Sequence, residues 1–289
     1  MAGTLRRTKK KKTTTPRTTG NNRSGQISAQ LKKRARLLSH RVLTHSVPES
    51  QRRQLCYKIA RNVLDNSLVM DSPNFTSSAA RDLQRMAELY DRAFFGGHCL
   101  AIAKHHGMQF RWSKRMTSTG GKTVRTIHTD RATGRQHIRY EIVLSAPLLF
   151  QTFSDLQRPI RVTGLLCTNR LQAMQRILEH ELIHLVEMVV WGDSCCAASR
   201  FQSIAGRLFG HTEHKHDLIT QQERAARKFN IRVGSVVQFR HEGTTCIGTV
   251  NRITRRATVL VPDRRGQLYD DGHRYRKYYV PISHLQQVH

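Results

Sequence analysis

Two histidines four residues apart, with a glutamate directly after the first, stand in the chain as His180-Glu181-Leu182-Ile183-His184. On an α-helix, residues i and i+4 lie on one face about one turn apart, so both imidazoles can bind the same ion. Glu181 would lie about 100° round the helix, where its carboxylate can take a proton from an attacking water molecule. The spacing therefore predicts a zinc site with His180 and His184 as ligands and Glu181 as general base.

This interpretation depends on the helix that carries the motif. Residues 171–190 place apolar side chains at helical spacing, and Gly192 follows them as a stop signal. Such a segment is typical of a helix with one face in a protein core. The competing interpretation is a core helix whose two histidines are hydrogen-bonded and bind no metal.

Further elements are expected on both sides of this helix. A capped amphipathic helix that ends at Gly96-Gly97 and two later helices are predicted at 72–97, 198–208 and 219–229. Alternating apolar residues predict strands at 108–113 and 137–145, with a turn at 119–122. Helices and strands in this order favour an α+β fold with a small antiparallel sheet.

The charge of the chain points to a polyanionic partner. Its 289 residues include 49 Lys and Arg against 20 Asp and Glu, a formal net charge of +29. Nucleic acid is the expected partner, and an acidic membrane surface is the weaker alternative. No apolar run is long enough for a transmembrane helix, and the first residues lack the apolar stretch of a secretory signal.

The six cysteines form no C-x-x-C pair, which is typical of reduced thiols in an intracellular protein. We therefore expect an intracellular, nucleic-acid-associated monomer, located in the nucleus if the host is eukaryotic, with no membrane association.

Changes in composition divide the chain into four regions. Residues 1–25 hold eight Lys and Arg and no acid, so we expect a disordered basic arm there. A basic helical segment follows at 26–70, and the domain with the histidine motif spans 71–230. In the arm, the residues expected to contact phosphate or to act as a nuclear address are Lys9, Lys10, Lys11 and Lys12. A solvated charge run without a partner is the alternative interpretation.

The last region, 231–289, contains four or five short strands separated by turns rich in Gly or Asp. This pattern predicts a small basic β-barrel of the SH3 or Tudor kind. A segment that interleaves cations with rings suits phosphate contact and base stacking, and its expected contact residues are Arg274, Arg276, Lys277 and Tyr278. A protein-binding or purely structural barrel, with some of the tyrosines in its core, is the alternative.

Four motifs, in order along the chain, resemble the SprT-like (Spartan-type) zinc metallopeptidase family. They are YDRAFFGG at 90–97, FRWSKRMT at 110–117 followed by Gly120-Gly121, IVLS at 142–145 followed by Leu148 and Leu149, and HELIH at 180–184. The similarity covers roughly residues 80–210. It implies a zincin-like fold and a protease that acts on DNA-bound or DNA-crosslinked proteins, with DNA as tether and activator.

The chain departs from this family at the third metal ligand. The family pattern H-G-x-x-F/W opens the next helix, and aligning Phe201 with its aromatic residue puts Ala197 where the histidine should stand. We rank His211 first as the replacement, although the chain must fold back over a helix about 16 Å long. Cys196 ranks second, because a thiolate suits zinc. The remaining alternatives are His214, His216 and a two-histidine site completed by water.

Glu187 lies seven residues after His180, on nearly the same face of the predicted helix. Three ligands along one straight helix would spread past a tetrahedral ion, so we do not expect Glu187 to bind the metal. A hydrogen bond that fixes the tautomer of a ligand imidazole and a surface salt bridge are the two expected roles.

These features predict a zinc metalloendopeptidase that cleaves proteins bound or crosslinked to DNA, with the basic arm and the barrel holding it on single- or double-stranded DNA. The alternative is a DNA-binding protein with a structural zinc site and weak or no catalytic activity.

Overall fold

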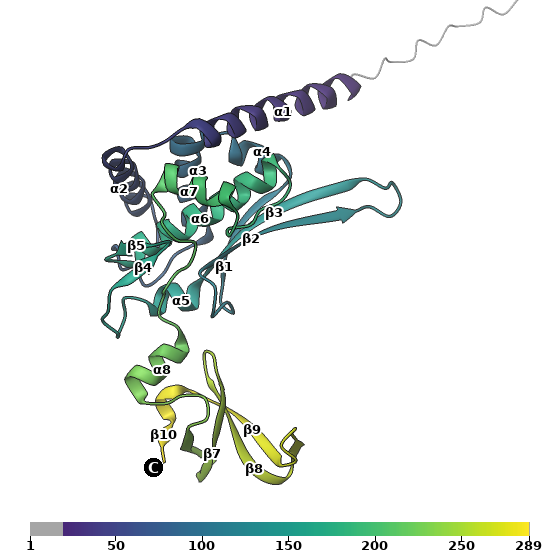
Figure 1. Ribbon diagram of the computed structural model, residues 1–289. Coiled ribbons are helices and arrows are strands. Elements are labelled where there is room, and N and C mark those ends of the chain that lie inside the picture. Colours follow the sequence, from purple (N-terminus) through teal and green to yellow (C-terminus); the bar gives the residue numbers. More distant parts are fainter. Residues whose placement is uncertain (1–19, 289) are drawn as a thin grey trace, which may run out of the picture.

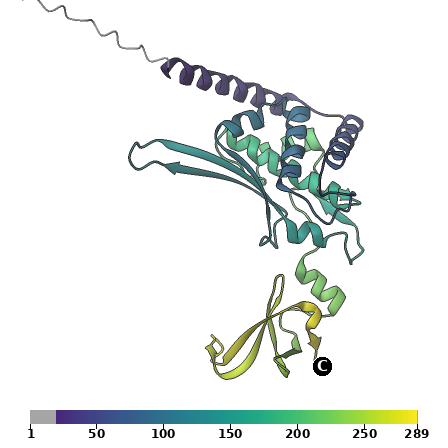
Figure 2. The ribbon, with the colours of Figure 1, turned by 180° about the vertical axis from the view of Figure 1, so that it is seen from behind.

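The computed structural model describes residues 20–288, with backbone alone for residues 20–25, and has a mixed α+β fold (Figures 1 and 2). The α-helices are α1 (Gly20–Thr44), α2 (Glu49–Asp65), α3 (Ala80–Phe95), α4 (Cys99–His105), α5 (Ala146–Gln151), α6 (Arg170–Val190), α7 (Ser199–Phe209) and α8 (Gln221–Phe229). The strands of the larger unit are β1 (Met108–Ser113), β2 (Gly121–Thr129), β3 (Gln136–Ser145), β4 (Ile160–Val162) and β5 (Leu165–Cys167). The C-terminal strands are β6 (Val236–His241), β7 (Thr244–Ile253), β8 (Ala257–Leu268), β9 (Arg274–Val280) and β10 (Gln286–Gln287), with a short 3-10 helix at Ile282–His284.

The central element is α6, which packs against α1 to α5, α7 and the strands β2 to β5. Its first turn is capped by Asn169, whose side chain accepts a hydrogen bond of 3.0 Å from the backbone N–H of Gln172. Leucines at helical spacing, among them Leu178, Leu182 and Leu185, are fully buried. The helix that carries His180 and His184 is thus held on all sides by the rest of the unit. None of the described helices is both long and apolar enough to cross a membrane.

The main sheet is mixed, which corrects the prediction of an antiparallel sheet. Its strand order is β1-β3-β2, with β3 parallel to β1 and antiparallel to β2. β3 takes the middle place because its last residues are apolar, with Ile142, Val143 and Leu144 all buried. The predicted turn at 119–122 gives way to β2 at Gly121, and this strand was not predicted.

Two basic helices, α1 and α2, form the segment predicted as helical at 26–70. α1 begins at Gly20, so the last residues predicted for the disordered arm, 20–25, are helical instead. Arg41 joins α1 to the core of the larger unit, because its Nε donates a hydrogen bond of 2.7 Å to the carbonyl oxygen of Phe94. Residues 1–19, with Lys9 to Lys12, lie outside the described part of the chain.

The C-terminal strands form one open sheet, in the order β10-β6-β7-β8-β9, so the predicted closed barrel is not found in the described residues. Neither end strand pairs on its outer side with another strand among residues 20–288. The register of β8 against β9 shifts between Pro262 and Gln267, where proline offers no N–H to the ladder. The sheet does not need closure to bury its apolar face, because Ala225 of α8, Ile231 and Leu285 pack onto it.

The buried apolar residues form two clusters, one in the larger unit and one around the C-terminal sheet. α8 connects them (Figure 1). Its Ala225 belongs to the second cluster, whereas Arg224 and Lys228 form ion pairs of 2.6 and 2.7 Å with Asp155 of the larger unit. The hydrogen bond from Arg224 is the main reason that the pKa of Asp155 falls to about 2.

We expect Asp155→Asn to lower the free energy of unfolding by roughly 1–2 kcal/mol at neutral pH, because two cations lose their partner. The folded pKa lies below the ordinary value of 3.8. The contribution is therefore complete above a pH of about 4 and is lost as the pH falls through about 2. Denaturant unfolding of both proteins between neutral and acidic pH measures the difference. Asp65→Asn is the control, since the exposed pair with Arg61 at 3.8 Å contributes little. A difference that stays constant down to a pH of about 2 would contradict the assignment.

Candidate metal centre

His180, His184 and Cys196 come together at one point on the surface of α6. Their ligand atoms all lie within 4.8 Å of one another, and the two Nε2 atoms are 3.1 Å apart. Phe201 of α7 packs against both imidazoles, with ring centroids at 4.9 and 4.6 Å. This cluster of two imidazoles and one thiol could hold a metal ion.

The tautomer of His184 is set by a chain of hydrogen bonds behind it. Glu187 is fully buried and pairs with Arg200 at 2.6 Å, so its carboxylate accepts the Ser194 hydroxyl proton at 2.6 Å. The Ser194 oxygen then accepts from Nδ1 of His184 at 2.7 Å. The Nε2 lone pair is left facing the cluster, which is the orientation a metal ligand needs. Glu187 thus orients His184 only indirectly, through Ser194, and its salt bridge with Arg200 is buried on the Glu187 side instead of lying on the helix surface.

His180 offers a neutral imidazole at the same place. Burial is the main reason that its pKa falls to about 3, and the neighbouring His184 lowers it further. Its Nδ1 is buried and has no hydrogen-bond partner in the described structure. A neutral ring with Nε2 toward the cluster is ready to give its lone pair to a cation.

Cys196 lies in the loop between α6 and α7 and is half-buried. The side chain of Arg200 holds this loop, because its guanidinium lies 4.5 Å from the ring centroid of Trp191 and 3.2 Å from Asp193. Burial raises the pKa of the Cys196 thiol. Binding of a cation here would therefore have to release the thiol proton.

Glu181 stands beside the cluster and points at the start of β2. Its Oε2 accepts a hydrogen bond of 2.7 Å from the Thr123 hydroxyl, and its Oε1 lies so close to Gly121 that a Cβ there would be only 2.6 Å away. A side chain at position 121 would therefore push the carboxylate aside. Burial raises the pKa of Glu181 to about 7, against the opposing effect of the Thr123 hydrogen bonds. A carboxyl with this pKa can accept a proton near neutral pH.

A cavity of about 210 Å³ opens beside these groups. Its walls come from the start of β2, the region of β4, α6, the loop after it and the segment after α7. The lining residues are Thr119, Gly120, Gly121, Val162, Thr163, Ile177, His180, Glu181, Cys196, His214, Lys215 and His216. His214 and His216, the lower-ranked ligand candidates, thus line the cavity but do not join the cluster. The Nε2 of His216 accepts the backbone N–H of Gly120 at 2.7 Å.

His211, ranked first as third ligand from the sequence, is placed elsewhere, and the structure puts Cys196 in the cluster instead. Gly210 ends α7 in the left-handed conformation with φ 70°, and the chain turns the imidazole of His211 inward. Its Nε2 donates to Glu179 at 2.9 Å, and the residue is buried. Glu179 precedes His180 on α6, so its side chain leaves the helix about 100° away from the ligand face.

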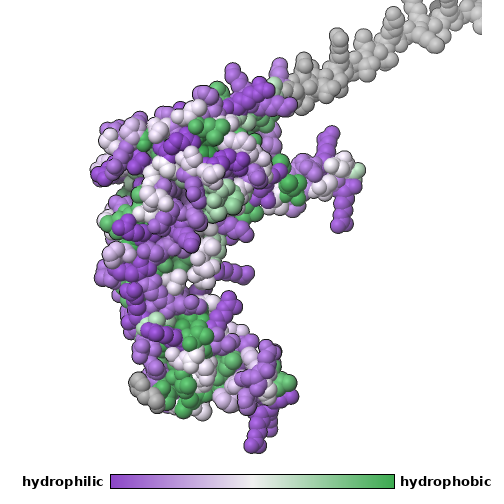
Figure 3. All heavy atoms as spheres, viewed as in Figure 1, coloured by the Kyte–Doolittle hydropathy of each residue, from purple (hydrophilic) through white to green (hydrophobic). Residues whose placement is uncertain are grey.

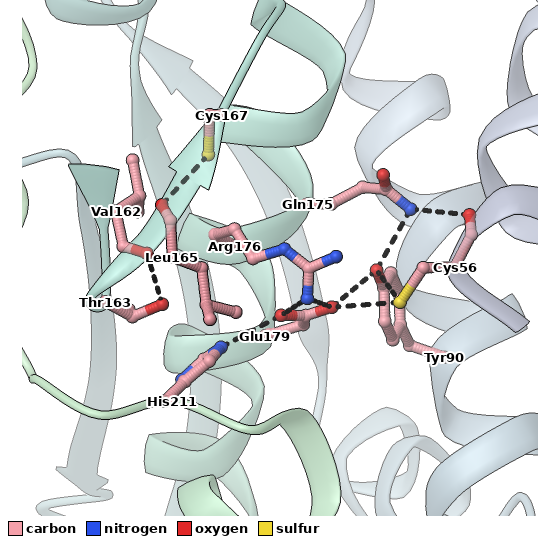
Figure 4. A network of polar contacts seen from close by, with 10 residues as sticks. All are labelled: Cys56, Tyr90, Val162, Thr163, Leu165, Cys167, Gln175, Arg176, Glu179 and His211. Carbon is pink, nitrogen blue, oxygen red and sulfur yellow. Dashed lines mark hydrogen bonds and ion pairs between the residues drawn. The ribbon is translucent and has the colours of Figure 1, made fainter. Parts of the chain in front are cut away.

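A buried polar network surrounds Glu179 (Figure 4). Arg176 donates to both of its carboxylate oxygens, at 2.8 and 2.7 Å, and the hydroxyl of Tyr90 donates at 2.7 Å. The pKa of Glu179 is lowered, since these partners outweigh the burial that would raise it. His211 therefore completes a hydrogen-bond network that joins α3 and α6 to the segment after α7.

The four C-terminal residues predicted to bind nucleic acid all have contacts within the protein. Tyr278 packs against Phe239 with ring centroids at 5.3 Å, so it belongs to the core side of the sheet. Arg276 pairs with Asp263 at 2.9 Å, Lys277 lies over the ring of Tyr269, and Arg274 donates to a backbone carbonyl. The exposed ring on β9 is that of Tyr279, at 63% exposure, which the sequence analysis did not select.

Three residues that position the cluster were not found from the sequence. Ser194 and Arg200 act through Glu187, and Thr123 acts on Glu181. The only signal for Arg200 was its place one residue before Phe201, the aromatic residue of the family pattern. Thr123 carried no signal because its contact with Glu181 joins segments far apart in the chain, and Ser194 carried none because its contacts depend on how the loop after α6 folds back.

We expect Cys196→Ala to weaken metal binding at least tenfold, because one of three ligands is lost. Titration with Co²⁺ measures this directly, since a thiolate ligand gives a charge-transfer absorption in the near ultraviolet. Cys195→Ala is the matched control, because this neighbouring thiol is exposed and lies outside the cluster. Survival of the thiolate absorption in Cys196→Ala would contradict the ligand assignment.

His211→Ala should affect stability and leave metal binding unchanged. We expect it to lower the free energy of unfolding by about 1–3 kcal/mol, because a buried carboxylate loses a hydrogen bond and a void remains. Its metal stoichiometry, measured by elemental analysis, should equal that of the unchanged protein. Loss of bound metal without loss of stability would restore His211 as a ligand.

The motifs that resemble the SprT-like family occupy neighbouring elements around α6. YDRAFFGG ends α3, FRWSKRMT covers β1 and the chain after it, and IVLS ends β3. β2 and β3 both contact the helix of the HELIH motif. Comparison of the chain with protein-family models, with curated proteins and with solved structures finds no significant match.

Proposed function

We propose that this protein is a zinc-dependent metalloendopeptidase of the SprT-like type that cleaves proteins bound or crosslinked to DNA. The observation that carries the proposal is the convergence of His180, His184 and Cys196 beside Glu181 in an open cavity. Each of these side chains has a position that suits its role, and no residue in the described part of the chain forms a competing ion pair with any of the three ligand atoms.

Zinc fits the donor set better than other common ions. Imidazole nitrogen and thiolate sulfur are its usual ligands, whereas Mg²⁺ and Ca²⁺ require oxygen. Zinc–nitrogen bonds of about 2.0–2.1 Å place two ligand nitrogens of a tetrahedral site about 3.3 Å apart. The two Nε2 atoms stand 3.1 Å apart, so the imidazoles need almost no movement.

The number of ligands supports a catalytic site over a structural one. Structural zinc sites are closed by four protein ligands, whereas catalytic sites have three and keep one position open. The cluster in the described residues has three, and a cavity lies next to it. The alternative of a DNA-binding protein with a structural zinc site would need a fourth protein ligand.

The chain's own residues supply the other parts of peptide hydrolysis. Zinc in this cluster would polarise the scissile carbonyl and make a nearby water molecule more acidic. Glu181 would accept the proton of the attacking water and pass it to the leaving amine. Thr123 holds the carboxylate in place, and Gly121 leaves it room. No described strand pairs with the outer edge of β2, so an extended peptide can add to it and reach the cavity.

Charge supports DNA as the second partner. The formal net charge of +29 favours association with a polyanion over any neutral or basic partner. A peptidase held on DNA meets other proteins on the same molecule far more often than in free solution. This local concentration would restrict cleavage to DNA-bound substrates without a separate recognition site for each of them.

We expect Glu181→Gln to reduce cleavage of a basic DNA-binding protein by at least about 100-fold, because the general base is lost. Zinc-loaded protein is incubated with the substrate, with and without DNA, and the fragments are separated by electrophoresis. Cleavage by the unchanged protein should require DNA. Zinc stoichiometry and DNA affinity should be the same in the variant.

Glu88→Gln is the matched control, since this carboxylate lies on the surface of α3 and pairs with Lys104 at 2.7 Å. It should cleave at the normal rate. Absence of cleavage by the unchanged protein, with zinc bound and DNA affinity intact, would favour the structural-zinc alternative. Equal cleavage by Glu181→Gln would remove Glu181 from the mechanism.

A further inference from the structure

The outer halves of β2 and β3 form a two-stranded ribbon that projects from the larger unit (Figures 1 and 2). We define the ribbon as residues 126–139. All of them are exposed except the half-buried Ile138. The two strands continue to pair with each other, with Thr126 opposite Arg139 and His128 opposite His137. The ribbon thus keeps regular strand geometry where no other element covers either face.

The tip of the ribbon is a tight and well-bonded turn. Asp130 accepts backbone hydrogen bonds from Ala132 and Thr133 at 2.9 and 2.8 Å, and its own N–H donates to the carbonyl of Arg135 at 2.8 Å. Isolated two-stranded hairpins have marginal stability in water. Among the described residues of the ribbon, only Ile138 at its root packs against the core, so the local bonding and the polar surface of the rest point to an external partner.

The charge of the ribbon defines the chemistry of that partner. Arg131, Arg135 and Arg139 have no carboxylate within ion-pair distance in the described structure. The single acid of the ribbon is Asp130, whose carboxylate accepts the backbone hydrogen bonds of the turn. The end of the ribbon is coloured mostly as hydrophilic in Figure 3. Unpaired guanidinium groups on a projecting arm match the phosphates of a nucleic acid.

We propose that this ribbon enters the major groove of duplex DNA. The inference rests on the proposed action at DNA, and it names the part of the protein that binds the duplex. Strands about 4.8 Å apart form a ribbon that fits a groove about 12 Å wide. The arginines at the tip can bond guanine edges or phosphates, and Gln136 can bond adenine. Thr126 and Thr129 on β2 and Thr133 in the turn offer further contacts.

Duplex DNA is a better match than a single strand. Sites for single strands present aromatic rings on which the bases stack. The ribbon contains no Phe, Tyr or Trp. Its shape and its donors therefore suit the regular groove of a duplex.

The root of the ribbon meets the candidate metal centre. Thr123, three residues before the ribbon begins, bonds Glu181, and Arg125 donates to the carbonyl oxygen of Gly192 just after α6. A duplex held by the ribbon would thus lie at the far end of the same strand that lines the cavity. A protein bound next to that duplex would be presented to the cluster.

The test compares two charge-matched double variants of the full-length protein. R131A/R135A removes two arginines from the ribbon tip, and R81A/R92A removes two exposed arginines from α3. Binding to a fluorescent duplex is measured by anisotropy over a range of salt concentrations. We expect the ribbon variant to bind roughly tenfold more weakly and to lower the salt slope by about 2, as for two lost phosphate contacts. The α3 variant should change much less.

A single strand of the same length and guanine methylation at N7 complete the test. The unchanged protein should protect N7, which lies in the major groove, and R131A/R135A should lose this protection while its single-strand affinity falls less. Equal losses in both double variants, equal losses on both DNA forms, or no N7 protection would each overturn the proposal.

The outcome is separable from that of the proposed peptidase. Glu181-dependent cleavage of a DNA-bound protein, measured with enough DNA to saturate both proteins, should have the same rate in R131A/R135A as in the unchanged protein. Absence of any Glu181-dependent cleavage would contradict the proposed function, and the comparison of DNA binding would still test the ribbon. Normal cleavage with equal DNA affinity in both double variants would sink the ribbon proposal alone.

Discussion

Three buried carboxylates on one helix constrain the rest of the larger unit. Glu179, Glu181 and Glu187 of α6 are each at most 4% exposed, and a buried carboxylate without partners would cost several kcal/mol. Successive helical residues turn by about 100°, so the three side chains leave α6 in different directions. Partners must therefore arrive from three sides. Some come from α6 and the chain directly after it, as Arg176, Ser194 and Arg200 do, and others from distant segments, as Tyr90, Thr123 and His211 do.

The same constraint decides which side chains are free to bind a cation. His211 belongs to the group that satisfies Glu179, so it is removed from the ligand candidates although it is nearby. Arg200 and Ser194 satisfy Glu187, and in doing so they fix the loop that carries Cys196 and the ring of His184. The partner of Glu181 is only a neutral hydroxyl, that of Thr123. The one carboxylate without a cation is thus the one beside the cluster.

Local patterns were enough to predict the main helix and its two histidines, because helical periodicity and the i,i+4 spacing are properties of a short segment. The third ligand was ranked by residue type and distance along the chain. Neither reveals that His211 is hydrogen-bonded to Glu179. β2 was missed because its outer half has little apolar alternation and is held by pairing with β3. Two further features depend on contacts between residues far apart in sequence. They are the parallel pairing of β1 with β3 and the failure of the end strands β9 and β10 to meet and close a barrel.

β2 runs without a break from Thr123, beside Glu181, to Thr129 just before the tip. A strand rises by about 3.4 Å per residue, so the six steps from Thr123 to Thr129 span roughly 20 Å. The strand therefore sets a fixed distance between the tip of the ribbon and the cavity. In the proposed complex with DNA at the tip, a folded domain held tightly on that DNA would lie too far from the cavity, whereas its tail or an unfolded segment could span the distance. Selection of loosely structured polypeptide would then follow from strand length, with no pocket needed to recognise sequence.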